Sequence, residues 1–177
     1  MDWSRVYNHV EKMMRLRGYD KDVQKIESTS SDNDMFLFHK GDHTTTFVYF
    51  HRSPKMNIDA VKEFIYWIET NQWRHSILVY DNIITSTTKK VIDSLDNHHI
   101  ELFDAKEFLY DITQLRYYCP HERVDKETAQ SIIKKYGNKL PKLLKSDPVC
   151  RYFGFQKGDI IRIHRKNGTI TFRIILK

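Results

Sequence analysis

The spacing of apolar side chains predicts a helix at the start of the chain. Apolar residues recur with helical periodicity at Trp3, Val6, Val10, Met13 and Met14. Such a stripe is typical of a helix that buries one face. Asp2 or Ser4 is placed to cap the first turn, and Gly18 is placed to end the helix.

The period then becomes that of extended strands. The small polar residues 27–34 predict a loop. Residues 35–39 and 44–51 predict two strands of a hairpin that turns around Lys40-Gly41-Asp42.

Helical and strand patterns alternate over residues 57–103. Asn57 is a candidate cap for a second helix, whose apolar face is formed by Ile58, Val61, Phe64, Ile65 and Ile68. A strand at 76–80, a helix at 87–95 and a strand at 100–103 follow. This order, with short connections, predicts a small α/β layer with parallel strands.

The last third of the chain has a different pattern. Asp125 opens a helix that closes at Gly137, with one face formed by Ala129, Ile132, Ile133 and Tyr136. Asp147-Pro148 predicts the cap and first residue of a short helix that ends at Gly154.

The final segment predicts a β-hairpin. Ile161 and Ile163 alternate with Arg162 and His164, and the second strand alternates in the same way at Ile170, Phe172 and Ile174. Asn167-Gly168 predicts a two-residue turn with two positive φ angles. One face of the hairpin should be buried, and the other should be polar and largely cationic, with Arg162, His164, Arg165, Lys166 and Arg173.

These patterns and the charge distribution together predict an α/β protein, α+β overall, with two domains. Residues 1–110 have a net charge of −3 and residues 111–177 a net charge of +9. We expect a small α/β domain over 1–110 and a domain of mixed helices and sheet over 111–177. A segment as cationic as the second is attracted to a polyanion or to an acidic protein surface.

Composition excludes several other classes of protein. No run of residues is long and apolar enough for a membrane span, and residues 1–12 contain no apolar signal core. The two cysteines, Cys119 and Cys150, cannot form a disulfide framework or a complete zinc site of their own. We therefore expect a soluble, unsecreted protein with reduced, buried thiols.

The common catalytic motifs are missing from the sequence, so we expect no catalytic residues and no cofactor. One spacing resembles that of nucleases, in which carboxylates and a lysine hold Mg²⁺ and activate water: Asp81 after one strand, with Asp104 and Lys106 after the next. Asp104 fits equally well as the N-cap of a short helical turn that ends at Phe108. Two alternatives therefore stay open: a Mg²⁺-dependent nuclease and a free-standing basic nucleic-acid-binding module.

The run from Leu140 to Lys166 contains the motif LP…DP…G…GD…R. This run resembles the fifth subunit shared by nuclear RNA polymerases I, II and III, together with the archaeal polymerase subunit that is its counterpart. Asp111-Ile112-Thr113 and Pro120-His121 are similar to the linker of that family. Residues 3–19, which end in Arg17-Gly18-Tyr19, and residues 64–84 resemble the N-terminal domain that only the eukaryotic form has.

The resemblance implies a non-catalytic subunit of a DNA-directed RNA polymerase. Its C-terminal assembly domain would dock on the largest subunit, among other polymerase chains, and its N-terminal jaw domain would lie beside downstream double-stranded DNA. We expect no membrane partner and no homo-oligomer. The implied subunit interface comprises Pro141, Asp147, Pro148, Arg151, Tyr152, Gly154, Lys157, Gly158, Arg162, Arg165 and Lys166. The residues expected close to DNA, which offer hydroxyl and ammonium groups for phosphates, are Thr85, Ser86, Thr87, Thr88, Lys89 and Lys90.

The chain also departs from the family pattern. Where the family has Thr-Pro-Ser-Ala, residues 85–88 keep the threonine and lack the proline, and the final hairpin has a shorter loop. Such shortening, with a composition rich in Asn, Ile and Lys, suits a viral or divergent member. The expected location is the nucleus for a cellular protein, or the virion or cytoplasmic virus factory for a viral one.

Overall fold

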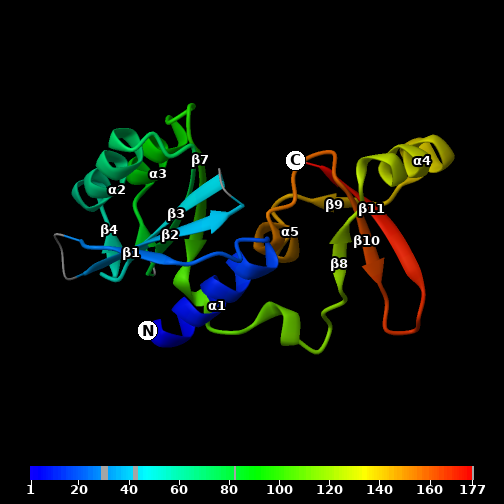
Figure 1. Cartoon of the computed structure of the whole chain (residues 1–177), viewed down its shortest axis with the longest axis horizontal. Helices are drawn as coiled ribbons and strands as arrows, with labels where there is room; N and C mark the ends of the chain where they lie inside the picture. The colour runs from blue at the N-terminus through cyan, green and yellow to red at the C-terminus, as the bar shows by residue number, and fades with distance from the viewer. Residues whose placement is uncertain (29–31, 42–43, 82, 177) are drawn as a thin grey trace. The chain divides into compact units, whose positions relative to one another are not determined.

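A computed structural model describes residues 1–28, 32–41, 44–81 and 83–176. The chain forms two compact units, Met1–Leu109 and Tyr110–Lys177. Both units combine helices with β-sheet (Figure 1), so the predicted fold class is confirmed. Asp42 of the first predicted turn and residues 29–31 of the predicted loop lie outside the described residues.

A five-stranded sheet in the order β1-β2-β3-β5-β7 forms the centre of the first unit. Its strands are β1 (Gln24–Ile26), β2 (Asn33–Lys40), β3 (Thr44–His51), β5 (His75–Tyr80) and β7 (His99–Asp104). β1, β2 and β3 pair antiparallel, whereas β3, β5 and β7 pair parallel, as predicted for that part of the chain. A separate pair of short parallel strands consists of β4 (Lys55–Met56) and β6 (Ile83–Ile84).

The loop predicted at 27–34 is wrong at its end, because β2 already begins at Asn33. Asn33 pairs with His51, and Asp34 pairs with Phe50. Polar residues suit this position because the carboxylate of Asp34 forms ion pairs with Lys25 (3.0 Å) and Arg52 (3.3 Å).

The helices of the first unit are α1 (Trp3–Leu16), α2 (Ile58–Thr70), α3 (Ser86–Asp93) and the short 3₁₀ helix η1 (Ala105–Phe108). The predicted caps are confirmed: the Asp2 side chain accepts a hydrogen bond from the Arg5 amide, and the Asn57 side chain accepts from two amides of α2. Each cap satisfies amides that have no partner within the helix.

Helices cover both faces of the sheet of the first unit. Successive residues of a strand point to opposite faces, so Phe47 and Tyr49 contact Phe64 of α2, while Phe50 contacts Tyr7 of α1. Figure 1 shows α2 and α3 on one side of this sheet and α1 on the other. Because both faces are buried, β5 contains the uninterrupted apolar run Ile77-Leu78-Val79 and not an alternating pattern.

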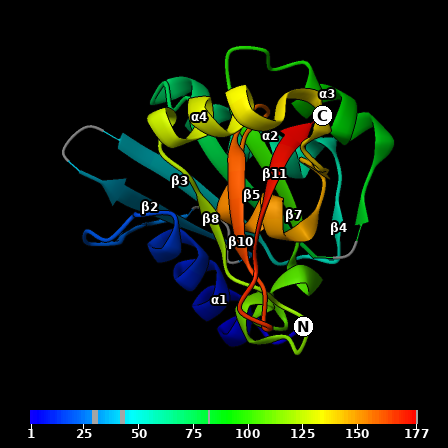
Figure 2. The same ribbon diagram turned by 90° about the vertical axis from the view of Figure 1, so that its right-hand side faces the viewer.

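The second unit contains a four-stranded sheet in the order β8-β10-β11-β9. Its strands are β8 (His121–Arg123), β9 (Lys142–Leu144), β10 (Ile160–His164) and β11 (Ile170–Leu176). Its helices are α4 (Lys126–Tyr136), α5 (Pro148–Phe153) and the 3₁₀ turns η2 (Ile112–Gln114) and η3 (Gly137–Lys139). Figure 2 shows β10 between β8 and β11.

The β10–β11 hairpin has a different turn from the one predicted. Of the pair Asn167-Gly168, only Gly168 has a positive φ, of 81°. The amide of Arg165 donates to the Thr169 carbonyl (2.9 Å), which makes a longer turn than the two-residue one. His164 consequently pairs with Ile170.

This turn changes which side chains share a face of the sheet. A shift of one residue in register moves every side chain of a strand to the opposite face relative to its partner strand. Ile161 lies opposite Arg173 and Ile163 opposite Thr171, so these two isoleucines do not share a face with Phe172. The prediction of one buried and one polar face is therefore wrong.

Both faces of the second sheet carry buried apolar clusters. On one face, Ile161 and Ile163 pack with Cys150 and Phe155. On the other face, Ile160 and Phe172 pack with a cluster that includes Val124, Ile132 and Leu140. Helix α4 supplies Ile132 but leaves Ile133 and Tyr136 largely exposed, so its apolar face is narrower than predicted.

The two cysteines are free thiols. Cys150 is buried, as predicted, and burial raises the pKa of its thiol to about 12. Cys119 is only partly buried. Among the described residues, no helix combines the length and apolar composition needed to cross a membrane.

Candidate functional site

The start of α3 contains the residues predicted to lie near DNA. Thr85 caps the helix: its hydroxyl accepts from the Thr88 amide and is 2.8 Å from the Thr88 hydroxyl. Thr88 is fully buried, so these two hydroxyl groups serve the helix itself. Four of the six predicted residues are exposed here: Ser86, Thr87, Lys89 and Lys90.

Several residues of the LP…DP motif have clear roles within the second unit. The Asp147 side chain accepts from the Val149 amide (2.9 Å), Pro148 is the first residue of α5, and Gly154 ends the helix with φ 66°. All three features agree with the sequence prediction. The Pro141 carbonyl accepts from the Ile174 amide, which joins the start of β9 to β11.

Other motif residues differ in exposure. Tyr152 is buried, Arg151 is partly buried, and Lys157 is exposed. Gly158 has φ 92°, and its amide donates to the Ile175 carbonyl (3.0 Å). The motif therefore contributes strongly to the fold of the second unit, and the interface role of its residues stays a prediction.

The cations of the last hairpin fall into two groups. Arg162 is compensated, because its guanidinium lies 3.3 Å from the carboxylate of Glu122. Arg173 donates to the Lys142 carbonyl. Arg165 and Lys166 instead line an open groove.

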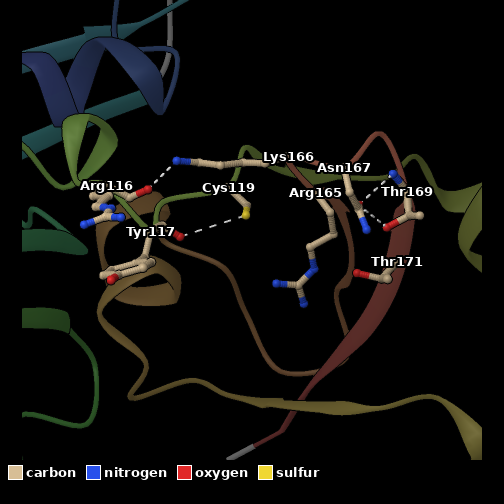
Figure 3. Close-up of a pocket in the computed structure, with 8 residues that line it drawn as sticks. All are labelled: Arg116, Tyr117, Cys119, Arg165, Lys166, Asn167, Thr169 and Thr171. Carbon is tan, nitrogen blue, oxygen red and sulfur yellow. Dashed lines mark hydrogen bonds between the residues drawn. The ribbon is translucent and has the colours of Figure 1, made fainter.

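This basic groove (Figure 3) has a volume of about 620 Å³ and is lined by Arg116, Tyr117, Cys119, Arg165, Lys166, Asn167, Thr169 and Thr171. The Lys166 ammonium donates to the Arg116 carbonyl, which joins the hairpin turn to the segment before β8. Sequence reasoning missed Arg116 and Tyr117, because the contact of Lys166 with the Arg116 carbonyl joins residues 50 positions apart, and it missed Thr171, whose place follows from the observed register. We found no sequence signal that would have indicated them.

The nuclease-like spacing does not form a ligand cluster in the described residues. Asp104 caps η1: its carboxylate accepts from the Lys106 amide (2.9 Å), and its own amide donates to Glu107. The alternative interpretation of Asp104 as an N-cap is thus confirmed. Asp81 follows β5, the strand beside β7, but does not join Asp104 in a group of metal-ligand side chains.

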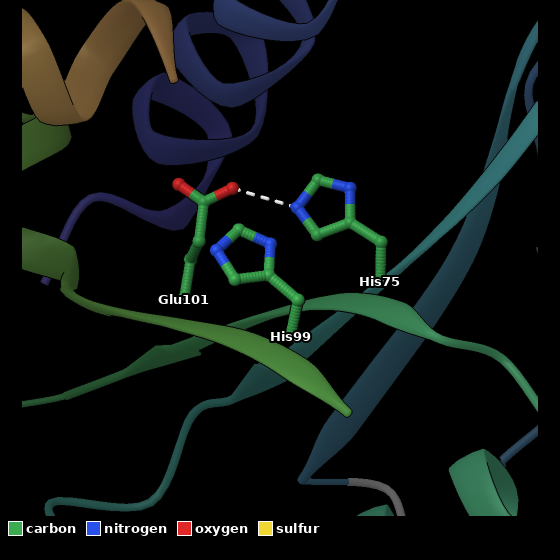
Figure 4. A group of neighbouring side chains, drawn as sticks. All are labelled: His75, His99 and Glu101. Carbon is green, nitrogen blue, oxygen red and sulfur yellow. Dashed lines mark hydrogen bonds and ion pairs between the residues drawn. The ribbon is translucent and has the colours of Figure 1, made fainter. Parts of the chain in front are cut away.

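The described residues contain one group of three side chains with metal-ligating atoms close together: His75, His99 and Glu101 (Figure 4). Both oxygens of Glu101 accept from Arg17, each at 2.8 Å, and one also lies 2.7 Å from His75. A bidentate guanidinium is a poor neighbour for a metal cation. The arrangement therefore fits a buried ion-pair network better than a metal site.

The electrostatics of Glu101 agree with that interpretation. Burial alone would raise its pKa, but the His75 hydrogen bond and the Arg17 charge lower the pKa of Glu101 to about 2. The carboxylate is therefore ionised at neutral pH and fixes the end of α1 to β5 and β7.

Comparisons with known proteins assign both units. A family model described as "RNA polymerase Rpb5, C-terminal domain" matches residues 110–175. A second model, described as "Restriction endonuclease", matches residues 1–111. The two matches define the class of protein: a nuclease-type α/β unit joined to a polymerase-subunit unit.

Two relatives that are similar to this chain across both units are named as RNA polymerase subunits. A Dictyostelium discoideum protein named as a subunit of DNA-directed RNA polymerases I, II and III is 26% identical over 171 residues, 90% of this chain and 87% of the relative. A putative DNA-directed RNA polymerase subunit of Invertebrate iridescent virus 6 is 27% identical over 192 aligned positions, 98% of this chain and 99% of the relative. Residues 110–175 belong to the Rpb5 C-terminal domain family and residues 1–111 to the restriction endonuclease family, while the similarity to RNA polymerase subunits runs across both units. The family resemblance seen in the sequence is thereby confirmed.

Proposed function

We propose that this chain is a non-catalytic accessory subunit of a multisubunit DNA-directed RNA polymerase, in which other chains perform the chemistry of transcription. One observation carries the proposal: the match to the polymerase-subunit model, over 110–175, coincides with the compact unit Tyr110–Lys177. Similarity to polymerase subunits over nearly the whole chain supports it further.

In this proposal the unit from residue 110 onward is the assembly domain, which docks on the largest polymerase subunit. Its net charge of +9 over 111–177 suits an acidic partner surface. Among the cations of the predicted interface, Lys157 and Lys166 are exposed, and Arg165 is partly buried in the wall of the basic groove.

The first unit would form part of the jaw around downstream DNA. Ser86, Thr87, Lys89 and Lys90 support this role, because they are exposed together at the start of α3. Hydroxyl and ammonium groups bind phosphates without reading base sequence. The loss of the family proline after Thr85 leaves these groups in place.

Purification through an affinity tag on this chain tests the proposal. We expect the large polymerase chains to be recovered with it in equal amounts, and to stay bound when salt is raised. Recovery of the chain alone, with tight and strongly salt-dependent binding to duplex DNA, would instead identify the free-standing basic module.

A nuclease is the second candidate, favoured by the restriction endonuclease match over 1–111. Because Asp104 caps η1, we expect no DNA cleavage by the isolated chain in the presence of Mg²⁺. The assay includes Asp104→Ala and Lys106→Ala. Mg²⁺-dependent cleavage that both substitutions abolish would replace the accessory role with a catalytic one.

The proposed location follows from the partner. A cellular member of this family would act in the nucleus, whereas a viral member would act in the virion or in a cytoplasmic virus factory. The relatives include both kinds of source.

A further inference from the structure

The basic groove of the second unit contains cations that form no ion pair with the described residues, in contrast to Arg123 and Arg162 of the neighbouring strands. Arg123 and Arg162 each lie within ion-pair distance of a carboxylate, at 3.4 and 3.3 Å. Within the described part of the chain, no carboxylate forms an ion pair with any of the three cations that line the groove: Arg116, Arg165 and Lys166. The described lining also contains no Asp or Glu.

A second observation points to a bound group. The hydroxyl oxygen of Thr171 is buried and has no hydrogen-bond partner among the described residues. Figure 3 shows this hydroxyl on the groove wall beside the guanidinium of Arg165. By contrast, the neighbouring Thr169 hydroxyl is already paired, because the Asn167 side-chain oxygen accepts from both the amide and the hydroxyl of Thr169. A guanidinium and an unpaired hydroxyl side by side can both donate to one anionic group.

The size and composition of the groove favour a polypeptide over nucleic acid. Binding to nucleic acid gains affinity from many phosphate contacts along a track, and this groove offers three cations around one hollow of about 620 Å³. Arg pairs strongly with planar carboxylates through two parallel hydrogen bonds. The ring of Tyr117, 84% exposed, adds an aromatic wall of the kind enriched in protein interfaces.

We propose that the basic groove binds an acidic polypeptide segment, with neighbouring Asp or Glu side chains, supplied by another chain of the polymerase. Arg165 and the Thr171 hydroxyl would hold one carboxylate, and Arg116 a second, while Lys166 keeps the two walls together. This inference rests on the proposed function and identifies the partner by its chemistry.

The first test uses nuclear magnetic resonance on the full-length protein. Three probes are titrated: a capped Gly-Asp-Glu-Asp-Glu-Gly peptide, its Asn/Gln counterpart and a short DNA duplex. We expect the acidic peptide to shift the amide signals of Arg165 and Thr171, and the neutral peptide to leave them unchanged. Shifts at the groove caused by the duplex and not by the acidic peptide would overturn the assignment.

Matched variants give the affinity readout. The groove variant combines Arg116→Gln with Arg165→Gln, which removes two groove charges but retains the contact of Lys166 with the backbone. The control variant combines Lys134→Gln with Lys139→Gln, which removes two exposed charges elsewhere on the unit. We expect at least about tenfold weaker peptide binding in the groove variant only. Equal weakening in both variants would show a general charge effect and contradict the proposal.

Assembly separates this inference from the proposed function. If wild type co-purifies with the polymerase and the groove variant does so less well than the control, both stand. If all three proteins co-purify equally and millimolar acidic peptide shifts no groove signal, the groove is not the docking site although the chain is a subunit. If wild type fails to co-purify, the proposed function itself is wrong.

Discussion

Glu101 illustrates how single residues hold the first unit together. Its side chain is 14% exposed and that of Arg17 is 5% exposed, so this ion pair is largely shielded from water. Removal of one partner from a buried pair leaves the other charge uncompensated, which is far more costly than loss of a surface pair.

We therefore expect Glu101→Gln to lower the free energy of unfolding of the first unit by about 3–5 kcal/mol. All three tryptophans of the sequence, Trp3, Trp67 and Trp73, lie in this unit, so denaturant unfolding followed by tryptophan fluorescence measures it selectively. Glu11→Gln, which breaks the exposed pair with Arg15, is the matched control and should cost at most about 1 kcal/mol. Equal effects of the two substitutions would contradict a buried role for Glu101.

The same carboxylate predicts a pH dependence. The pKa of Glu101 is depressed from 4.5 to about 2, so its contribution to stability is fully present above pH 4.5 and is lost as the pH falls toward 2. The difference in stability between wild type and Glu101→Gln should therefore shrink over this range. A difference that stays constant down to pH 2 would exclude the proposed linkage.

At the residue scale, sequence predicted local partners well and distant ones poorly. Asp2, Asn57, Asp125 and Asp147 were predicted as caps because each side chain bonds an amide two or three residues away. The Arg17–Glu101 pair joins residues 84 positions apart, and no spacing rule connects them.

At the scale of elements, α5 is a short helix whose two ends are both specified by the sequence. Asp147→Ala removes the acceptor for the Val149 amide and should lower stability by about 0.5–2 kcal/mol. Asp147→Asn keeps an acceptor and should cost less. Circular dichroism melting measures the change, while an unchanged tryptophan signal confirms that the first unit is unaffected. Identical melting of all three proteins would show that this cap contributes nothing.

The start of α3 gives a prediction for the assembled enzyme. Lys89→Ala with Lys90→Ala removes up to two phosphate contacts, so the slope of log affinity for DNA against log salt should become shallower by up to about 2. Replacement of both residues by Arg keeps the charge and is the control. The Ala variant could instead show the same salt slope and the same elongation-complex lifetime as wild type. That result would mean that this segment does not contact DNA.

The last hairpin shows why some elements escape sequence reasoning. The sequence predicts both strands but a turn of two residues, and a difference of one residue moves every side chain of a strand to the other face relative to its partner. Asn167 satisfies its side chain through Thr169 and needs no positive φ. The place of Thr171 in the basic groove depends on this register, and for that reason the sequence does not predict it.

At the scale of the whole molecule, the two units differ in charge and in their matches to known families. We expect a fragment of residues 110–177 to fold and to bind the polymerase alone. Its stability margin should be small, because domains of about this size bury only about 60% of the surface of the unfolded chain. Amide exchange and co-purification of the fragment test this expectation. If the fragment is unfolded and fails to bind the polymerase while the full chain binds it, the proposed division of roles between the two units is contradicted.

The family was recognisable from sequence because the LP…DP motif combines helix caps and tight turns that specify one fold. The motif places Asp147, Gly154 and Gly158 where the backbone needs an acceptor or a positive φ. Contacts with a partner chain require no particular residue spacing within this chain, unlike helix caps and tight turns. The residues of the subunit interface therefore could not be derived from the sequence in the same way.

Native mass spectrometry of the complex purified through a tag on this chain tests the polymerase assignment most directly. We expect a single large assembly that contains the polymerase chains and one copy of this 21.3 kDa subunit, and that releases the subunit on gentle activation. A spectrum with only the free chain, or with a homo-oligomer of it, would contradict a role as a polymerase subunit.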